Sequence, residues 1–362
     1  MPNVFAVIMA GGVGSRFWPR SREKTPKQLL EIVGKGTLIQ NTVKRISELI
    51  EPKNIIIVTS KVQKPTIIKQ IPSIPAENII EEPLGRNTAP CIGLASLFIR
   101  RIDPDAVSVV LPADHIIHDE EEFHRVLRLA TWVAYESGKL ITVGIQPTRP
   151  ETGYGYIQVI DVDDGTNPYF EKGVFNVKTF AEKPNIEIAK KFIESGDFLW
   201  NSGMFIWRVD SVLREIERFL PELYKELLNI DNFIGSKKYE NIVETAYRKI
   251  RGISVDYGVM EKSHDVYVIK GKFGWSDVGS WDEVYRISGK DENGNTVTGQ
   301  AYLQGTKNSF IHAGEKFVAA IGVDDLIIVA ADDAVLVCKK GQSQDVKEVV
   351  DFLRRKQKAE FL

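Results

Sequence analysis

Short apolar runs alternate with helical patterns over the first 150 residues. The apolar runs lie at residues 4–9, 55–59, 106–111 and 140–144. A continuous apolar run of this length is typical of a strand that is buried on both faces of a parallel sheet. Helical patterns lie between the runs, at residues 38–50, 88–101 and 121–135. This alternation predicts a doubly wound α/β fold, similar to a Rossmann fold, with a mixed and mostly parallel sheet.

The pattern changes after residue 150. Residues 154–160 and 177–181 alternate between apolar and polar, which is typical of half-exposed strands. Helices are predicted at residues 186–195, 211–219, 221–228 and 237–250. Asn185 can cap the first of these helices, and Gly196 can end it. We interpret this part as a substrate-binding elaboration of the same domain.

From about residue 294 the chain turns to short strands separated by Gly, Asp and Asn. Strands are predicted at residues 317–323, 326–331 and 334–339, and a closing helix at residues 345–356. A hexapeptide periodicity can be traced here, but its register breaks too often to predict a solenoid. We therefore expect one domain over residues 1–290, with halves at about 1–150 and 151–290, and a small β domain over residues 291–362.

Composition and charge narrow the class of protein. The formal net charge of -2 over 362 residues gives no electrostatic reason to expect nucleic acid or an anionic membrane as a partner. Cys91 and Cys338 have no metal-ligand or redox spacing, which suits a reducing compartment. The N-terminus lacks the features of a secretory signal, and no apolar run approaches the roughly 20 residues of a membrane span. We expect a cytoplasmic protein.

The strongest chemical signal is the glycine-rich segment GGVGSRFWPRSREKTPKQ at residues 11–28, directly after the first strand. Glycines at such a turn let backbone N–H groups approach phosphate oxygens. Arg16 and Lys27 would add positive charge to the same site. A P-loop is excluded because Gly-Lys-Ser/Thr is missing, and a dinucleotide fingerprint fails because Phe17 replaces its third glycine.

This segment resembles the signature of the sugar-1-phosphate nucleotidyltransferases, and in its detail that of the mannose-1-phosphate guanylyltransferases. Further segments match the family in the same order: EPLGRNTAP at 82–90, LPADH at 111–115, ETGYGYI at 151–157, EKP at 182–184, WNSGMF at 200–205 and WSDVGSW at 275–281. The resemblance spans positions 4 to about 350. It implies a nucleotide-binding half before residue 150, a sugar-phosphate half after it, and a short left-handed β-helix at the C-terminal end.

The resemblance also implies the reaction. GMP would pass from GTP to α-D-mannose 1-phosphate with Mg²⁺, giving GDP-mannose and pyrophosphate. Both reactants are polyanions, so the site must supply cations and hold the attack in line, and no protein nucleophile is required. Asp114, at the carboxyl end of a predicted strand, and Asp277 are the implied metal ligands.

The implied site residues fall into three groups. Arg16, Lys27 and Lys183 would be the catalytic cations, with Arg22 a weaker member. The nucleotide-binding residues would be Gly11, Gly12, Gly14, Ser15, Glu82, Gly85, Asn87 and Thr88. The sugar phosphate would contact Gly155, Glu182, Lys183 and Asn201. Guanine presents adjacent N–H donors, and our hypothesis is that Glu82 or Glu81 accepts them.

Other interpretations stay open at this point. The substrates could be another sugar 1-phosphate, such as glucose 1-phosphate, or another triphosphate. The chain could also be a regulatory subunit that binds a sugar nucleotide without turnover, although Arg16, Lys27, Asp114 and Asp277 are all present. Some family members carry a cupin-type isomerase domain, which we do not expect here because only about 70 residues follow Asp291. Exposed strand edges after residue 294 favour a homodimer.

Two further groups of polar residues need an interpretation. His115 and His118 flank the acidic run at residues 119–122 and could be mistaken for metal ligands. An acidic start of a helix explains this run better. Asp256 and Glu261 lie in a segment that is also similar to the family, but the sequence assigns them no role.

Overall fold

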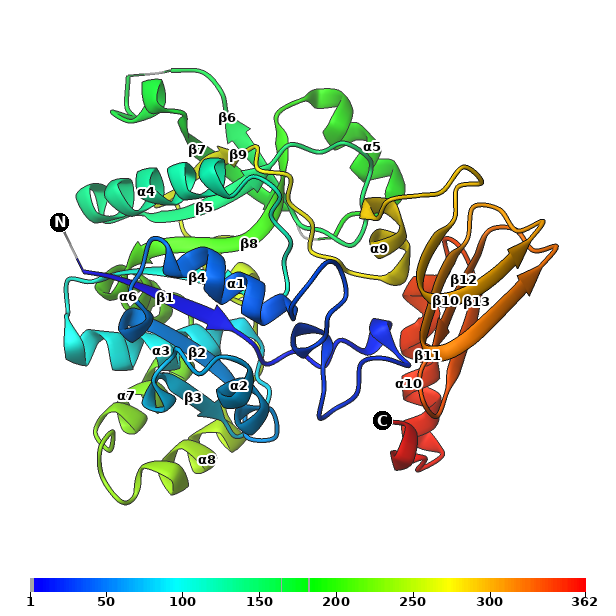
Figure 1. Ribbon diagram of the computed structural model, residues 1–362. Coiled ribbons are helices and arrows are strands. Elements are labelled where there is room, and N and C mark those ends of the chain that lie inside the picture. Colours follow the sequence, from blue (N-terminus) through cyan, green and yellow to red (C-terminus); the bar gives the residue numbers. More distant parts are fainter. Residues whose placement is uncertain (1–2, 164, 182) are drawn as a thin grey trace. The chain divides into compact units, whose positions relative to one another are not determined.

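The computed structural model describes residues 3–163, 165–181 and 183–362, which form two compact units (Figure 1). The large unit contains the chain up to Gly11 together with residues 43–113 and 117–275. The small unit contains residues 12–42, 114–116 and 276–362. Both units are therefore discontinuous in sequence, whereas the proposed division at residue 290 is linear and stays a prediction.

A nine-stranded mixed sheet forms the centre of the large unit. Its strands are β1 (Val4–Met9), β2 (Ile55–Ser60), β3 (Ile79–Glu82), β4 (Val107–Pro112), β5 (Leu140–Ile145), β6 (Tyr156–Ile160), β7 (Val174–Ala181), β8 (Phe198–Arg208) and β9 (Val266–Gly271). Their order is β3-β2-β1-β4-β8-β5-β9-β7-β6. The first four strands pair in parallel, and β8 lies antiparallel between β4 and β5. The predicted α/β fold with a mixed sheet is confirmed.

Helices accompany the strands of this sheet (Figure 1). They are α1 (Leu38–Ser47), which crosses the division between the units, and α2 (Lys64–Gln70), α3 (Thr88–Ile102), α4 (Glu120–Ser137), α5 (Ile186–Ser195), α6 (Val209–Phe219), α7 (Pro221–Asp231) and α8 (Tyr239–Lys249). The Asp119 side chain accepts a hydrogen bond from the backbone N–H of Glu122 at the start of α4. The acidic run is therefore the beginning of a helix, as predicted.

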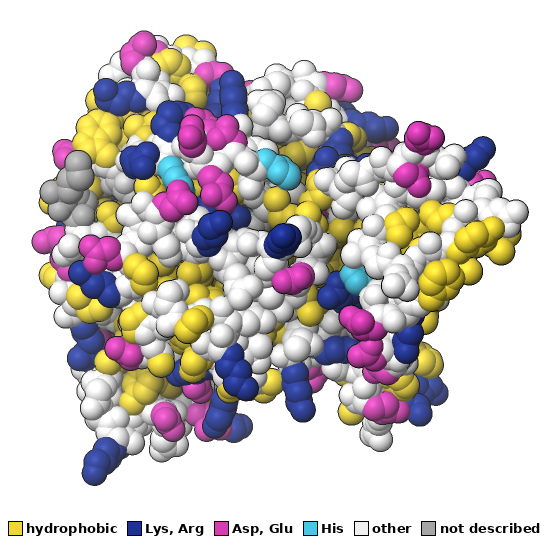
Figure 2. Space-filling view, in the orientation of Figure 1, with side chains coloured by type: hydrophobic (Ala, Val, Ile, Leu, Met, Phe, Trp, Pro, Cys, Tyr) yellow, Lys and Arg dark blue, Asp and Glu magenta, His cyan; other side chains and the backbone are white. Residues whose placement is uncertain are grey.

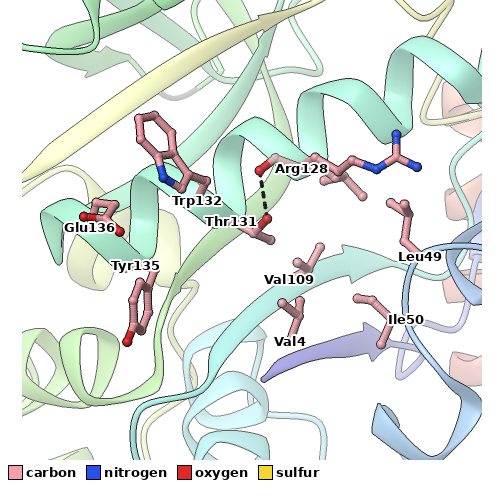
Figure 3. A pocket seen from close by; sticks show the side chains of 10 residues that line it. Val4, Leu49, Ile50, Val109, Arg128, Thr131, Trp132, Tyr135 and Glu136 are labelled. Atoms are coloured by element: carbon pink, nitrogen blue, oxygen red, sulfur yellow. Dashed lines mark hydrogen bonds between the residues drawn. The ribbon is translucent and has the colours of Figure 1, made fainter. Parts of the chain in front are cut away.

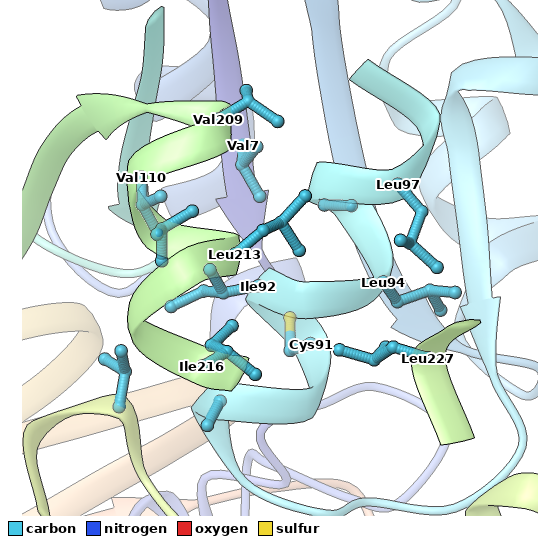
Figure 4. Packing of buried hydrophobic residues seen from close by; sticks show 14 of the residues in the cluster. Val7, Cys91, Ile92, Leu94, Leu97, Val110, Val209, Leu213, Ile216 and Leu227 are labelled. Carbon is cyan, nitrogen blue, oxygen red and sulfur yellow. The ribbon is translucent and has the colours of Figure 1, made fainter. Parts of the chain in front are cut away.

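The core against one face of the sheet is built by α3, α6 and α7 (Figure 4). Adjacent residues of β4 point to opposite faces: Val110 joins this core, while Val109 lies on the side of α4. Cys91 is a free thiol buried in this core. A Cβ at Gly93 would lie 2.5 Å from Leu227 Cδ1, so the close approach of α3 and α7 requires glycine here.

The small unit carries a four-stranded sheet and two helices. The strands are β10 (Thr296–Gln304), β11 (Phe310–Ile321), β12 (Leu326–Ala330) and β13 (Val335–Lys339), and the helices are α9 (Trp281–Ile287) and α10 (Val346–Arg355). The first three strands pair in parallel, and β13 returns antiparallel to β12. This confirms the predicted small β domain with its terminal helix.

Several elements were not predicted from the sequence, notably β3, β8, β9, β10, α2 and α9. The longest strand of the large sheet, β8, contains Asn201, Ser202 and Gly203, and Gly203 has a positive φ of 69°. These residues interrupt its apolar pattern, so periodicity does not reveal the strand. A separate finding concerns membranes: in the part of the chain that the structure describes, no helix is long and apolar enough to cross one.

Candidate active site

The glycine-rich segment forms a tight turn in the small unit. Gly14 adopts the left-handed conformation (φ 65°, ψ 39°) just before a short 3-10 helix at Ser15–Phe17. A Cβ on Gly14 would lie 2.5 Å from the Cβ of Lys27 and 3.0 Å from its backbone nitrogen. The turn needs glycine both for its backbone conformation and for its packing on Lys27. The loop is completed by Gln28, whose Nε2 donates to the carbonyl of Gly12 at 2.9 Å.

Lys27 is buried, with only 5% of its surface exposed. Its ammonium donates to Asp114 Oδ2 at 2.8 Å and to the carbonyl oxygen of Asp277 at 2.6 Å. The same Nζ lies 5.3 Å from the ring centroid of Phe17, within the range of a cation–π contact. Lys27 thus connects the glycine loop to both aspartates that the resemblance implies as metal ligands.

The charge state of Asp114 is set by its neighbours. Burial raises the pKa of its carboxyl, but the Lys27 ammonium and His115 together lower it by more, so the net pKa lies below the usual range. The ring Nε2 of His115 lies 4.0 Å from Asp114 Oδ1. Asp114 is therefore held as a carboxylate at neutral pH, which is the form that binds a cation.

Asp277 lies on a strained piece of backbone. Its Oδ1 accepts a hydrogen bond from the N–H of Gly279 at 3.0 Å. Val278, between these two residues, has a positive φ of 47°, which is unfavourable for a β-branched residue. Its side chain is fully buried in the core of the small unit, together with Trp281. Core packing thus holds the conformation that directs the Asp277 carbonyl toward Lys27.

These groups face one cavity of about 350 Å³ in the small unit. Its lining residues are Gly14, Ser15, Arg16, Phe17, Lys27, Asp114, His115, Asp277, Gly279 and Lys347. The structure therefore brings together Arg16, Lys27, Asp114 and Asp277, which come from three separate segments of the chain. Sequence reasoning missed Lys347, because it lies in α10, far from every recognised motif. Sequence reasoning also assigned no role in the site to His115, which lines the cavity.

The predicted nucleotide-binding segment of the large unit is built around Asn87, which has a positive φ of 69°. Its Oδ1 accepts from the N–H of Thr88 at 2.9 Å and caps α3. Thr88 Oγ1 in turn accepts from the N–H of Val255 at 2.8 Å. Gly85 has open space where a Cβ would lie. Asn87 and Thr88 thus have defined structural contacts at the start of the helix.

Glu82 and Glu81 occupy different environments. Glu82 is buried and accepts a hydrogen bond from the hydroxyl of Tyr247 at 3.0 Å. Burial raises the pKa of Glu82 to about 7, against the opposing effect of hydrogen bonds from Tyr247 and Cys91. A Cβ on Gly11 would lie 3.7 Å from Glu82 Oε2, so this carboxyl lies close to the start of the glycine-rich segment. Glu81 is instead paired with Lys64 at 3.2 Å.

The predicted sugar-phosphate residues also lie in the large unit. The backbone N–H of Asn201 donates to the carbonyl of Gly155 at 2.8 Å, which brings these two residues together. The Asn201 side chain donates to Asp256 Oδ1 at 2.6 Å and accepts from the N–H of Gly203 at 3.0 Å. Asp256 therefore orients Asn201, a contact that the sequence did not reveal. Lys183 has a positive φ of 36°, and Glu182 lies outside the described residues.

Arg22 lies elsewhere in the small unit. Its guanidinium pairs with Asp333 at 2.6 Å and donates to the carbonyl of Phe361. It does not line the cavity of the glycine loop. The structure thus shows Arg22 in contact with the C-terminal segment, and the weaker phosphate-binding role considered from the sequence stays a prediction.

A separate cavity of about 710 Å³ lies in the large unit between α4 and the strands β1 and β4 (Figure 3). Its lining is mostly apolar, with Val4, Val109 and Trp132 among its residues and Arg128 and Glu136 as its charged groups. None of the predicted site residues lines it. Of the predicted catalytic and metal-binding residues, Arg16, Lys27, Asp114 and Asp277 line the cavity of the glycine loop instead.

The cavity of the glycine loop offers a partial set of metal ligands. Among the described residues, no group of three or more His, Cys, Asp or Glu side chains gathers as a metal site. Asp114 and Asp277 nevertheless face the same space. A hard cation commonly takes one or two carboxylates and completes its shell with phosphate oxygens and water, so this arrangement fits a metal that binds together with a phosphate ligand.

Comparison with known proteins supports the same chemistry. Residues 5–294 match the nucleotidyl transferase family, and residues 303–353 match the MannoseP isomerase/GMP-like beta-helix domain. Mannose-1-phosphate guanylyltransferases of Klebsiella pneumoniae and Escherichia coli are 42% and 41% identical, over 98% of this chain and 75% of each relative. A crystal structure from Thermus thermophilus, described as a mannose-1-phosphate geranyltransferase, has a TM-score of 0.86 at 32% identity. The alignment covers 97% of this chain and 99% of that one.

These similarities extend over nearly the whole chain and include both of its predicted parts. The nucleotidyl transferase match contains every predicted site residue, and the C-terminal match contains Lys347. Members of the family typically use a divalent metal ion with nucleotide and sugar-phosphate substrates. The chain belongs to the mannose-1-phosphate guanylyltransferase family of nucleotidyltransferase enzymes.

Proposed function

We propose that this enzyme transfers GMP from GTP to α-D-mannose 1-phosphate with Mg²⁺, releasing pyrophosphate and forming GDP-mannose. The observation that carries the proposal is that Arg16, Lys27, Asp114 and Asp277 face a single cavity beside the glycine turn. Cations and carboxylates that converge on one polar space suit a reaction between two anions. The family relationship supports the identity of both substrates.

The chemistry is an in-line displacement at phosphorus. A phosphate oxygen of the sugar phosphate forms a bond to the α-phosphorus, and the bond to the bridging oxygen of the β-phosphate breaks. The electron pair of that bond leaves with pyrophosphate. Catalysis of this step depends mainly on positioning the reactants and on positive charge that stabilises the transition state. We assign this contribution to Arg16 and Lys27.

Lys27 has a second task in this scheme, because it keeps Asp114 ionised. Asp114 and Asp277 would hold the Mg²⁺ ion, which when bound would neutralise charge on the phosphates. Lys27 is buried, and two hydrogen bonds fix the position of its ammonium. The Lys27 side chain therefore needs little reorganisation when the substrate binds. The backbone N–H groups of the turn, around Gly12, Gly14 and Ser15, would contact the nucleotide phosphates.

We propose Glu82, rather than Glu81, as the group that reads the guanine base. Its carboxyl is buried and oriented by Tyr247, whereas Glu81 is engaged with Lys64. An ionised Glu82 could accept hydrogen bonds from the adjacent N–H donors of guanine. Gly11, Gly85, Asn87 and Thr88 would complete the nucleotide-binding residues.

The sugar phosphate would bind through residues of the large unit. Lys183 would neutralise its phosphate, and Asn201 would contact sugar hydroxyls from the orientation that Asp256 imposes. Gly155 would allow the sugar to approach the backbone. Glu182 stays in the proposal on the family resemblance alone.

We also infer a homodimer formed through the small unit. Exposed apolar side chains lie over β10–β13 (Figure 2), among them Tyr302, Phe317, Ile321, Val335 and Val337. Val335 and Val337 are each 59% exposed on β13, the edge strand, where a second copy could cover them. We also propose that the enzyme acts in the cytoplasm, a reducing compartment that suits the free cysteines Cys91 and Cys338.

One experiment tests the reaction and its specificity together. Pyrophosphate release would be measured for GTP, ATP, UTP and dTTP against mannose 1-phosphate and glucose 1-phosphate, with and without Mg²⁺. We expect release to be fastest with GTP and mannose 1-phosphate and to be lost when the metal is chelated. Preference for another pair would correct the substrates, and no release with any pair would reject catalysis.

A further inference from the structure

Lys347 faces the cavity of the glycine loop from the C-terminal helix α10. This helix is held in place by Val346 and Val350, which are buried in the same core as Phe17 and Trp18. Phe17 and Trp18 directly follow Arg16. The core of the small unit therefore places the first turn of α10 against the turn that carries Arg16.

The cations of this cavity differ in what they contact. Lys27 is committed to Asp114 and to the carbonyl of Asp277. Lys347 is exposed to the solvent, and no hydrogen bond or ion pair of its side chain is found within the described part of the chain. Arg16 is also exposed, and no hydrogen bond or ion pair of its side chain is found among the described residues. Two cations that share one cavity and have no partner among the described residues indicate an anionic ligand of more than one charge.

The position of Lys347 in its helix points the same way. It is the second residue of α10, where the partial positive charge of the helix N-terminus makes a cation unfavourable. Helix stability therefore does not explain a lysine at this site. An anion in the cavity would be attracted both by the ammonium and by the end of the helix.

We propose that Lys347 binds the β- and γ-phosphates of the nucleoside triphosphate and the pyrophosphate formed from them. This inference rests on the proposed function. The sugar phosphate is assigned to Lys183 in the large unit, which leaves the leaving group for the cavity of the small unit. When the bond between the α-phosphorus and the bridging oxygen breaks, its electron pair stays on pyrophosphate. Lys347 then stabilises the added charge without proton transfer. The C-terminal domain thereby contributes a phosphate-binding residue to the reaction.

The test compares Lys347→Met and Lys347→Arg with Lys356→Met, which removes an equal charge just after the same helix. Binding of inorganic pyrophosphate with Mg²⁺ would be measured by calorimetry, and the KM values for GTP, mannose 1-phosphate and pyrophosphate by steady-state kinetics in both directions. We expect Lys347→Met to weaken pyrophosphate binding about tenfold or more and to raise the KM for GTP and pyrophosphate. The KM for mannose 1-phosphate should stay unchanged, Lys347→Arg should retain most of the binding, and Lys356→Met should match the wild type.

Failure of this inference differs from failure of the proposed function. If the wild-type enzyme neither binds pyrophosphate nor turns over, the proposed function is wrong, and the inference falls with it. If the wild type binds pyrophosphate and Lys347→Met binds it equally well, only the role of Lys347 is overturned. An equal loss in Lys356→Met would assign the effect to overall charge and would also overturn it. Since Lys347 is exposed, thermal unfolding of Lys347→Met should match that of the wild type.

Discussion

The Nζ of Lys27 lies 2.8 Å from Oδ2 of Asp114, although 87 residues separate them in the chain. Lys27 begins a short 3-10 helix that follows the glycine loop, and Asp114 comes two residues after β4. The same ammonium also donates to the carbonyl of Asp277, which fixes its position beside Asp114. Lys27 is buried and Asp114 is partly buried, and removing one charge of such a pair leaves the other without compensation, so this contact is sensitive to mutation.

Lys27→Met is expected to lower the rate of GMP transfer by about 100-fold or more, because it removes the cation that we propose to act on the reacting phosphates. The thermal midpoint should fall as well, since Asp114 loses its partner. Lys24→Met provides a matched control, because Lys24 is exposed just upstream in the same segment. A Lys27→Met enzyme with the activity of the control would contradict the assignment.

Asp277→Asn should raise the Mg²⁺ concentration needed for half-maximal activity about tenfold, because a neutral amide is a weaker ligand for a hard cation. The change keeps the shape of the side chain and its ability to accept from Gly279. Titration of activity with Mg²⁺ at saturating GTP measures the effect. Asp282→Asn, on the nearby helix α9 and outside the cavity lining, is the comparison; an equal shift in both would argue against a specific ligand role.

Gly14→Ala is expected to destabilise the small unit more than Gly34→Ala does. Both glycines have positive φ values, 65° and 73°, so each substitution costs about 1–2 kcal/mol of backbone strain. Only at Gly14 would the new Cβ also collide with Lys27, at 2.5 Å, whereas Gly34 has open space. Thermal unfolding and transfer activity of the two variants separate these effects. Equal behaviour would show that the overlap with Lys27 has no consequence.

Glu82→Gln should make the protein more stable at alkaline pH. Burial raises the pKa of Glu82 to about 7 from the ordinary value of 4.5, so the folded state favours the protonated form. The stability from this group is complete below pH 4.5 and is lost as the pH rises through 7. Relative to the wild type, Glu82→Gln should therefore gain up to about 3 kcal/mol at pH 8 and little at pH 4.5.

The control for this prediction is Glu81→Gln, which changes the neighbouring carboxylate that pairs with Lys64. Its stability should follow the wild type at each pH. The same Glu82→Gln variant should lose preference for GTP over ATP, because an NH2 donor replaces one of the two carboxylate oxygens that would accept from the adjacent N–H donors of guanine. Unchanged preference would remove Glu82 from base recognition while leaving the stability argument intact.

His312 should make the small unit sensitive to acid. Burial and the nearby Arg20 lower its pKa to about 4 from the ordinary 6.5, and Arg20 contacts its Nε2 at 2.5 Å. Because the folded state disfavours the charged ring, stability falls as the pH decreases from 6.5 toward 4, by up to about 3 kcal/mol. His312→Gln should flatten this slope in thermal unfolding scans, and the exposed His264→Gln should not. A slope unchanged in His312→Gln would assign the acid sensitivity to other groups.

Much of the fold follows from local patterns that the sequence displays directly. Buried strands such as β1 are continuous apolar runs, and helices such as α5 carry their own caps, Asn185 and Gly196. These signals depend only on residues close together in the sequence, so they can be recognised without knowledge of the fold. The glycine turn and its cations were predicted in the same way, from spacing within one segment.

The tertiary structure decided what the local patterns could not. The order of the sheet inserts β8 between β4 and β5, a pairing of strands distant in the chain that no periodicity encodes. The position of Lys347 at the cavity depends on where α10 packs, which is set by the burial of Val346 and Val350 in a core shared with Phe17. The sequence by itself determined the fold class, and its motifs pointed to the glycine turn and to the two aspartates that line one cavity with it, because these signals lie in contiguous residues. Only the folded chain determined which distant side chains meet, because long-range packing is a property of the whole core.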